Sequence, residues 1–365
     1  MEPTKEWKFP SNGHLIRNRT VLAALTNKQS NEDGTLSNEE INFLLRRADG
    51  GFGIVTTAAS HVMENGQGWH GEMGVWGDHH IPGLTRLAQG LRERGATSLV
   101  QIFHGGMRAP AELIGCTPIS ASINNENTGN EAAREMTSDE IEEMIEAFAA
   151  AAERCEKAGM DGVEIHGAHG YLIDQFFWEG TNQRTDSYGG SMAARSRFAI
   201  ELIEACRSEV GPDFPIILRW SQWKQQDYEA KLVNSPEELE RFLKPLVEAG
   251  VDIFHASTRR FWEPEFEGSD LNLAGWTQKL SGKPTMSVGS VGLTEDFISG
   301  TFASKQEAVE KAGIDELVER MNNHGFELIA VGRALLQDPE WLIKVKEGRL
   351  NEVESFAKKS LAKLY

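Results

Sequence analysis

Two histidines and one tyrosine directly follow a short apolar run near the middle of the chain. The run, DGVEI, covers residues 161–165, and His166, His169 and Tyr171 come after it with glycines between them. A short apolar run after a long helical stretch is typical of a buried parallel strand. Imidazole and phenol groups at the end of such a strand can donate hydrogen bonds and protons, and glycines let the backbone approach a ligand closely. The pattern predicts a site for acid–base or hydrogen-bond chemistry.

The same histidines also permit a metal site. His166 and His169, at positions i and i+3, could ligate zinc with His104 as a third ligand. Neither an HxH nor an HExxH pattern accompanies the pair. A zinc-dependent barrel hydrolase is therefore the alternative on these residues, and a pair of core histidines without chemical function is a third interpretation.

Strand-like and helix-like segments alternate along the chain. Eight apolar runs have the length and composition of buried strands: 20–25, 52–59, 97–103, 161–165, 215–219, 251–256, 285–288 and 327–331. Helical periodicity lies between most of them, at 38–48, 82–93, 137–157, 193–210 and 235–248. This alternation predicts an α/β fold, a (β/α)8 or TIM barrel. A doubly wound open sheet is the alternative, but no GxGxxG pattern follows the first run.

We expect residues 1–365 to form a single barrel, because the chain shows no internal repeat and no low-complexity linker. A loop rich in Gly, Pro, Ser and Asn follows the third strand at about 104–135, and a loop of that length is more often functional than accidental. Two helix starts carry local signals. Ser37 is the predicted N-cap of one helix, with Glu40 at the capping-box position, and Thr137 begins a second, long helix.

Composition limits the partners and the compartment. The net charge of −18 disfavours nucleic acids and anionic membranes as partners, although local loops could still hold a phosphate. Cys116, Cys155 and Cys206 form neither a disulfide framework nor a CxxC cluster, which fits a reducing compartment. The first ten residues have no apolar signal region, and no stretch of about 18 apolar residues occurs. A cytoplasmic protein is expected.

A longer ordered motif begins at the histidines. His166 is followed by His169 and Tyr171, and the pattern N-x-R-x-D-x-Y-G-G-S then spans Asn182 to Ser191. This order resembles the old yellow enzyme family of FMN-dependent ene-reductases, in which the second histidine can be replaced by asparagine. The resemblance extends from about Arg19 to Trp341 and implies an FMN-binding barrel.

The resemblance also implies which residues contact the flavin ring. Ala24, Leu25 and Thr26 match the segment after the family's first strand, where the threonine side chain approaches the flavin. Ala59 aligns with a small residue that packs near the flavin. Gln101 aligns with a glutamine that hydrogen-bonds the pyrimidine edge of the ring.

Three places depart from the family pattern. Ala24 replaces the usual proline after the first strand. Met107 stands where the family usually has arginine, although Arg108 follows it, and this change affects the expected substrate contacts. The segment Glu295 to Glu307 is longer than the usual connection between the last two strands.

A charged group and two glycine motifs complete the expected cofactor site. Arg219 ends the fifth strand, where position alone fits a structural ion pair as well as a ligand contact, and the resemblance implies that it faces the N1–C2=O edge of the flavin. Gly289 and Ser290 follow the seventh strand, and Gly332 and Arg333 follow the eighth. Barrels commonly bind phosphate between these two strands, with backbone N–H groups and positive charge as donors.

The reaction implied by the resemblance is an NAD(P)H-dependent reduction of an activated alkene through FMN. His166 and His169 would hydrogen-bond a carbonyl or nitro oxygen, and Tyr171 would protonate the α-carbon. No resident metal is expected, and a homo-oligomer is compatible with the resemblance. A flavin-dependent enzyme that oxidises or demethylates amines is the alternative within the family.

Overall fold

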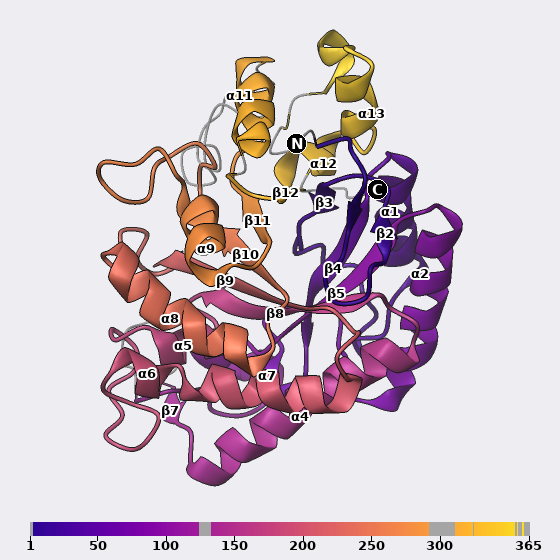
Figure 1. The fold of residues 1–365 in the computed structure, drawn as a ribbon. Coiled ribbons are helices and arrows are strands. Elements are labelled where there is room, and N and C mark those ends of the chain that lie inside the picture. The colour runs from indigo at the N-terminus through magenta and orange to yellow at the C-terminus, as the bar shows by residue number, and fades with distance from the viewer. Residues whose placement is uncertain are drawn as a thin grey trace.

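Eight parallel strands close into a barrel in the computed structural model, which describes residues 3–123, 133–291, 311–323, 325–354, 356 and 360 (Figure 1). Around the barrel the order is β10 (Ile253–Ser257), β11 (Thr285–Val288), β12 (Leu328–Val331), β3 (Thr20–Leu22), β4 (Ile54–His61), β5 (Thr97–Phe103), β8 (Gly162–His169) and β9 (Ile216–Lys224). All eight neighbouring pairs are parallel. The predicted (β/α)8 barrel is confirmed, and the open doubly wound sheet is wrong.

Helices cover the outside of this barrel (Figure 1). The longer ones are α1 (Asn38–Asp49), α2 (Ile81–Glu93), α4 (Ser138–Lys157), α7 (Arg197–Val210), α8 (Pro236–Ala249), α9 (Leu273–Ser281) and α11 (Lys311–Asn322). Two short helices, α12 (Arg333–Gln337) and α13 (Trp341–Lys346), follow the last strand. Among the described residues, no helix combines the length and the apolar character needed to cross a membrane.

The N-termini of α1 and α4 test the capping signals read from the sequence. The hydroxyl of Ser37 accepts the backbone N–H of Glu40, as predicted for an N-cap. The predicted capping box there is wrong, because the Glu40 carboxylate is buried and accepts hydrogen bonds from Asn27 and Ser30 instead. At α4 the capping box is complete, since Thr137 and Glu140 bond each other's backbone N–H groups.

Several elements differ from their predicted bounds. The strand expected at 161–165 continues to His169, and the one expected at 215–219 continues to Lys224, because the two strands stay paired beyond their apolar runs. The first strand ends at Leu22 rather than at residue 25. The helix expected at 193–210 is divided, with the short α6 (Met192–Arg195) separated from α7 by Ser196.

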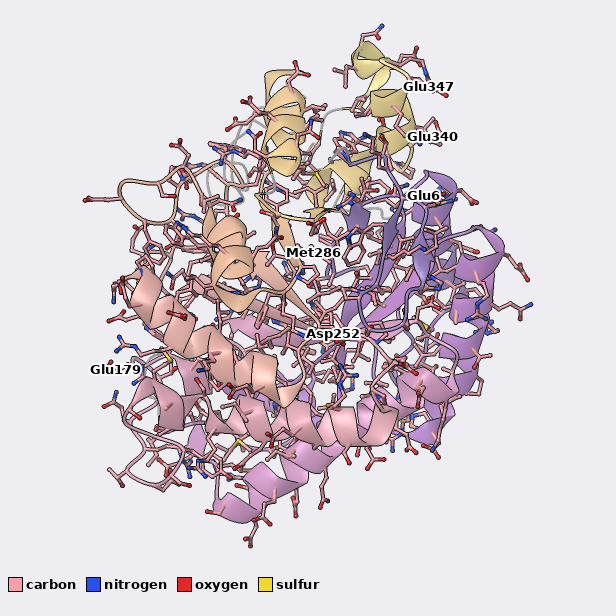
Figure 2. All side chains as sticks on the ribbon, viewed as in Figure 1. Glu6, Glu179, Asp252, Met286, Glu340 and Glu347 are labelled. Atoms are coloured by element: carbon pink, nitrogen blue, oxygen red, sulfur yellow. The ribbon has the colours of Figure 1, made fainter. Side chains whose placement is uncertain are left out.

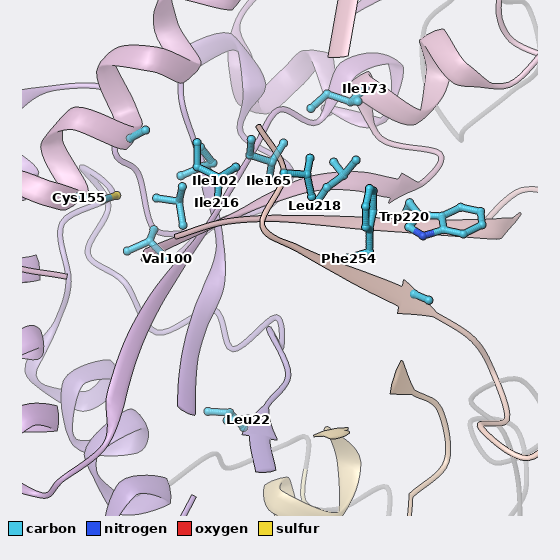
Figure 3. Close-up of a cluster of buried hydrophobic side chains, with 14 of the residues drawn as sticks. Leu22, Val100, Ile102, Cys155, Ile165, Ile173, Ile216, Leu218, Trp220 and Phe254 are labelled. Atoms are coloured by element: carbon cyan, nitrogen blue, oxygen red, sulfur yellow. The ribbon is translucent and has the colours of Figure 1, made fainter. Parts of the chain in front are cut away.

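Apolar side chains fill two layers. The larger cluster lies between strands and helices, and Figure 3 shows Val100, Ile165 and Leu218 from three adjacent strands within it. The smaller cluster lies inside the barrel and includes Met286 and Phe9. Figure 2 shows Met286 towards the middle of the molecule and acidic residues such as Glu179 at its edge.

An N-terminal hairpin contributes to the inner layer. Its strands β1 (Trp7–Lys8) and β2 (Leu15–Ile16) are antiparallel, and Phe9 and Ile16 are almost fully buried against barrel residues. His14 Nε2 lies 3.1 Å from the hydroxyl of Thr97 at the start of β5, and Arg17 donates to the carbonyl of Phe52 just before β4, so the hairpin covers the end of the barrel opposite the strand C-termini.

The chain between β5 and α4 runs past the C-terminal ends of the strands. Its described parts form η3 (Gly106–Arg108), α3 (Ala111–Ile114), β6 (Ile119–Ser120) and β7 (Arg134–Glu135), and β6 pairs with β7. The middle of this excursion, 124–132, and the predicted long segment Glu295 to Glu307 lie outside the described residues.

Candidate active site

The two histidines and the tyrosine converge at the C-terminal end of β8. The rings of His166 and His169 lie 5.2 Å apart and perpendicular, and the ring of Tyr171 lies 5.0 Å from that of His166. Both imidazoles are buried at the barrel mouth, the opening at the C-terminal ends of the barrel strands, whereas the tyrosine is half-buried. The structure therefore brings together the three side chains that sequence spacing predicted as a group.

His169 is held from several sides. Its backbone has a φ of 64°, which turns the chain out of the strand. Its N–H bonds the hydroxyl of Ser221 at 3.1 Å, and its imidazole Nε2 lies 2.8 Å from the hydroxyl of Ser257. The indole of Trp223 stacks on the imidazole, with ring centroids 4.3 Å apart. These contacts fix the ring plane of His169.

Burial keeps both imidazoles neutral. Desolvation, reinforced by the nearby Arg219 guanidinium, lowers the pKa of His166 to about 3. The same causes, in the same order, lower the pKa of His169 well below its usual range. Each ring can therefore donate one N–H to a ligand at neutral pH without carrying positive charge. The pair suits hydrogen bonding to an oxygen that gains negative charge during a reaction.

Tyr171 is the hydroxyl group beside this pair. It occupies the N-cap position of α5 (Leu172–Phe177), after a turn at Gly170 whose φ of 81° favours glycine. Its ring meets Phe103 edge-on at 5.3 Å, and its hydroxyl lies 3.3 Å from the amide nitrogen of Gln225. Tyr171 is only half-buried, in contrast to the two imidazoles.

A buried polar network lies deeper in the barrel, and the sequence interpretation overlooked half of it. The amide nitrogen of Gln101 donates to Glu164 at 2.6 Å, and Nδ1 of His255 lies 2.6 Å from the other carboxylate oxygen. Burial opposes ionisation of Glu164, yet His255, Arg219 and Gln101 together hold its pKa at about 2. The alternation of inward residues on β8 would have indicated Glu164, and the same reasoning on β10 would have indicated His255.

Arg219 is a buried guanidinium beside a cavity. It is 7% exposed, its Nη2 lies 3.3 Å from the Ser257 hydroxyl, and its Nε has no hydrogen-bond partner among the described residues. A cavity at the ends of β11, β12 and β3 is lined by Arg219, Ala24, Leu25, Gly289, Ser290, Gly332 and Arg333, among others. A buried guanidinium donor that faces a cavity suits a ligand with several acceptor atoms, as an FMN ring and phosphate would be.

The glycine motif in this cavity is sterically required. Gly289 has a φ of 146°, and a methyl group added there would lie 2.8 Å from the carbonyl oxygen of Thr258. The next residue, Ser290, also has a positive φ of 50°, and its hydroxyl lies 3.2 Å from Nη2 of Arg333. Backbone and guanidinium donors are thus close together, which fits a phosphate.

Three predicted cofactor contacts, Thr26, Ala59 and Gln101, lie outside the cavity lining. Thr26 follows the lining residue Leu25, and its side chain is exposed. Ala59 is buried on β4, directly opposite Gln101 on the neighbouring strand.

The geometry gives no support to the zinc interpretation. Nε2 of His104 lies 3.0 Å from the side-chain oxygen of Asn65, and its Nδ1 accepts the N–H of Gly106. Both ring nitrogens of His104 are therefore engaged away from His166 and His169. Across the parts of the chain that the structure describes, no group of three His, Cys, Asp or Glu side chains has the spacing of a metal site.

Comparisons with known proteins agree with this geometry. Residues 11–352 match the model of the NADH:flavin oxidoreductase / NADH oxidase family. The chain is 32% identical over 364 residues to the probable NADH-dependent flavin oxidoreductase YqiG of Bacillus subtilis, covering 95% of this chain and 88% of that protein. It is 30% identical over 364 residues to the NADH:fumarate oxidoreductase of Klebsiella pneumoniae, where the match spans 94% of this chain but 36% of the relative.

A solved structure shows the same fold. The old yellow enzyme homologue from Zymomonas mobilis aligns with a TM-score of 0.81 at 20% identity, covering all of this chain and 97% of the other. The barrel, the cavity beside Arg219 and the match along 11–352 lead to one assignment. The chain belongs to the NADH:flavin oxidoreductase / NADH oxidase family, that of the old yellow enzymes, and is an FMN-dependent oxidoreductase that uses NADH or NADPH.

Proposed function

We propose that this enzyme reduces the C=C bond of α,β-unsaturated carbonyl or nitro compounds. The observation that carries the proposal is the grouping of two neutral imidazoles, His166 and His169, with the Tyr171 hydroxyl at the barrel mouth. An NADH:fumarate oxidoreductase among the relatives, which acts on an alkene conjugated to carboxylates, supports this substrate class.

The cofactor would be held by residues of the cavity at the ends of β11, β12 and β3. Gly289, Ser290, Gly332 and Arg333 would hold the phosphate through backbone N–H groups and the guanidinium. Arg219, which lines the cavity, would hold the flavin ring through its guanidinium. When bound, FMN supplies the hydride donor for the β-carbon of the substrate.

The other contacts to the flavin ring are assigned from the positions of the residues alone. We assign the walls of the ring site to Ala24, Leu25 and Ala59, and the pyrimidine edge to Gln101. Thr26, which is exposed in the structure, would lie at the rim of the site. Gln101 can bond the ring through its carbonyl oxygen, which would accept, or through its second amide N–H, because one N–H of the amide already donates to Glu164.

The chain's own residues would orient the substrate and supply the proton. His166 and His169 each donate one N–H to the substrate oxygen, which stabilises the negative charge that develops there. Tyr171 gives its hydroxyl proton to the α-carbon and is reprotonated from solvent. Hydride and proton together saturate the double bond.

The first experiment is a visible absorption spectrum of the purified protein, recorded before and after anaerobic NADPH or NADH. We expect an oxidised-flavin spectrum that bleaches with NAD(P)H and returns when cyclohexenone is added. An enzyme that NAD(P)H reduces but that no enone or nitroalkene reoxidises would refute the alkene substrate. Bleaching by an amine in place of NAD(P)H would identify the amine-oxidising alternative.

A further inference from the structure

We infer that Gln225 and Arg108 are positioning residues that direct the Tyr171 proton towards the substrate. This inference rests on the proposed role of Tyr171 as proton donor. The three side chains come from the segments that follow β9, β5 and β8, so they meet only at the barrel mouth.

A chain of two hydrogen bonds joins them. Nη2 of Arg108 donates to the side-chain carbonyl oxygen of Gln225 at 2.6 Å. The amide nitrogen of Gln225 donates to the hydroxyl oxygen of Tyr171 at 3.3 Å. The guanidinium carbon of Arg108 also lies 5.5 Å from the centroid of the tyrosine ring. All three side chains are half-buried, so water screens these contacts incompletely.

Arg108 fixes the orientation of the Gln225 side-chain amide. A guanidinium has donors only, so the amide oxygen of Gln225 must face Arg108 and its NH₂ group must face Tyr171. The phenol oxygen therefore accepts this bond and keeps its own proton. Within the described ranges, the Tyr171 hydroxyl donates no hydrogen bond to the protein, which leaves its proton available to a substrate.

The same bond assists the transfer itself. When the O–H bond of Tyr171 breaks and a C–H bond forms at the α-carbon, the electron pair stays on the phenolic oxygen. The amide N–H of Gln225 then points at a negative charge, and a hydrogen bond to a charged acceptor is stronger than one to a neutral group. The guanidinium of Arg108 favours the same charge. The pair therefore stabilises the transition state more than the ground state.

Buried contacts hold the two loops at this spacing. The Gln225 backbone N–H donates to the His169 carbonyl at 3.3 Å. The neighbouring Lys224 forms an ion pair with Asp174 at 2.7 Å, and the other Asp174 oxygen accepts the N–H of Gly170 at 2.7 Å. The end of β9 is thus fastened to the turn that carries Tyr171.

The loop that carries Arg108 is fastened to the same turn. The side-chain oxygen of Gln175 accepts the N–H of Met107 at 3.2 Å, and its amide nitrogen donates to the Gly170 carbonyl at 2.8 Å. Met107, which replaces the family's usual arginine, is buried, and its successor Arg108 occupies the mouth.

Two substitutions of Gln225 separate this role from packing. Gln225→Leu removes the donor, and we expect the reoxidation of reduced enzyme by an enone to slow about tenfold. Gln225→Glu keeps the shape and the bond to Arg108 but has only acceptors, so Tyr171 must donate its proton to the carboxylate. We expect Gln225→Glu to be slower still, on the order of 10²-fold. A packing role predicts the reverse order, because Glu preserves the side-chain volume.

Arg108 variants and a glutamine on α2 provide the controls. Arg108→Lys keeps a donor to the Gln225 amide oxygen and should retain most of the reoxidation rate. Arg108→Met removes that donor, so the Gln225 amide can rotate by half a turn, and reoxidation should slow about as much as in Gln225→Leu. Gln89→Leu alters an exposed glutamine on the outer helix α2 and should change neither half-reaction. Reduction by NADPH, FMN dissociation constants and melting temperatures should stay at wild-type values in the Gln225 and Arg108 variants.

A double-mutant cycle in the Tyr171→Phe background completes the test. If Gln225 acts through Tyr171, Gln225→Leu should cause no further loss there, and in wild type it should raise the solvent deuterium isotope effect on reoxidation. The inference is overturned, while the proposed function stands, if Tyr171→Phe slows reoxidation but the Gln225 variants reoxidise at the wild-type rate. It is also overturned if Gln225→Glu reoxidises faster than Gln225→Leu. A Tyr171→Phe variant that an enone reoxidises at the wild-type rate overturns this inference and the role of Tyr171 as proton donor, whereas the alkene substrate stands.

Discussion

At the scale of single residues, charge state distinguishes the hydrogen-bond donors at the barrel mouth from the proton donor. His166 and His169 are kept neutral by burial, so they can donate hydrogen bonds but hold no extra proton to give. Tyr171 lies next to them with its hydroxyl bonded through oxygen to Gln225. Among these three side chains, the proton for the α-carbon is therefore expected from the phenol.

Tyr171→Phe should slow the alkene half-reaction by roughly 10²- to 10⁴-fold, because a positioned general acid contributes about that factor. Reduction by NAD(P)H needs no proton from this residue and should stay close to wild type. Stopped-flow absorbance measures the two half-reactions separately. Equal loss in both would remove Tyr171 from the role of proton donor.

Arg219→Gln should weaken FMN binding by about 10- to 100-fold, since it removes a charged donor from the cavity. Fluorescence titration of the apoprotein with FMN measures this. Arg197→Gln, at a half-exposed arginine on α7, is the control and should bind FMN as wild type does. Unchanged affinity in Arg219→Gln would mean that the guanidinium serves only the Glu164 network.

At the scale of elements, one buried ion pair joins the end of β9 to the turn after β8. Lys224 and Asp174 are both fully buried, and burial raises the pKa of the aspartate and lowers that of the lysine. Each charge is therefore maintained by the other against desolvation. Their pairing holds Gly170 and Gln225 in place, so it shapes the mouth without touching a ligand.

Asp174→Leu should lower the free energy of unfolding by about 3–5 kcal/mol, because it leaves Lys224 buried without a counter-charge. Adding Lys224→Met should recover much of this loss. Urea denaturation followed by circular dichroism compares the variants. A double variant as unstable as the sum of the two single variants would show that the charges act independently.

At the scale of the whole molecule, buried neutral histidines make stability depend on pH. His104 and His166 have pKa values lowered to about 3 in the folded chain, mainly by desolvation, whereas an unfolded histidine titrates near about 6.5. Between these two values the unfolded chain binds more protons than the folded chain. Stability therefore rises with pH in this window and is lost as pH falls.

The melting temperature should fall steadily from about pH 6.5 down to about pH 4, and these two groups should add no change above about pH 7.5. Differential scanning calorimetry across this range tests it. His166→Asn should make the fall shallower, since one of the histidines that bind a proton in the unfolded chain but not in the folded chain is gone. A melting temperature that is constant down to pH 4 would contradict the assignment of buried neutral imidazoles.

Local sequence patterns determined most of the elements. The runs at 97–103 and 285–288 became strands with those bounds, and Ser37 caps its helix as predicted. Thr137, predicted to begin its helix, is the N-cap one residue before it. These features depend on residues within one or two turns of each other, so neighbouring side chains contain the necessary information. The order of His166, His169 and Tyr171 likewise predicted a grouped site, because strand ends gather at one face of a barrel.

Contacts between distant segments were decided only by the closed barrel. Glu164 meets His255 across 91 positions, and Arg108 meets Gln225 across 117. The extension of β8 to His169 also came from pairing with β9 rather than from its own residues. Such contacts arise when strand register and loop closure fix which side chains face each other, and no local periodicity encodes that geometry. The sequence by itself thus determined the fold class and the main reactive groups, whereas the tertiary structure determined how those groups are held and charged.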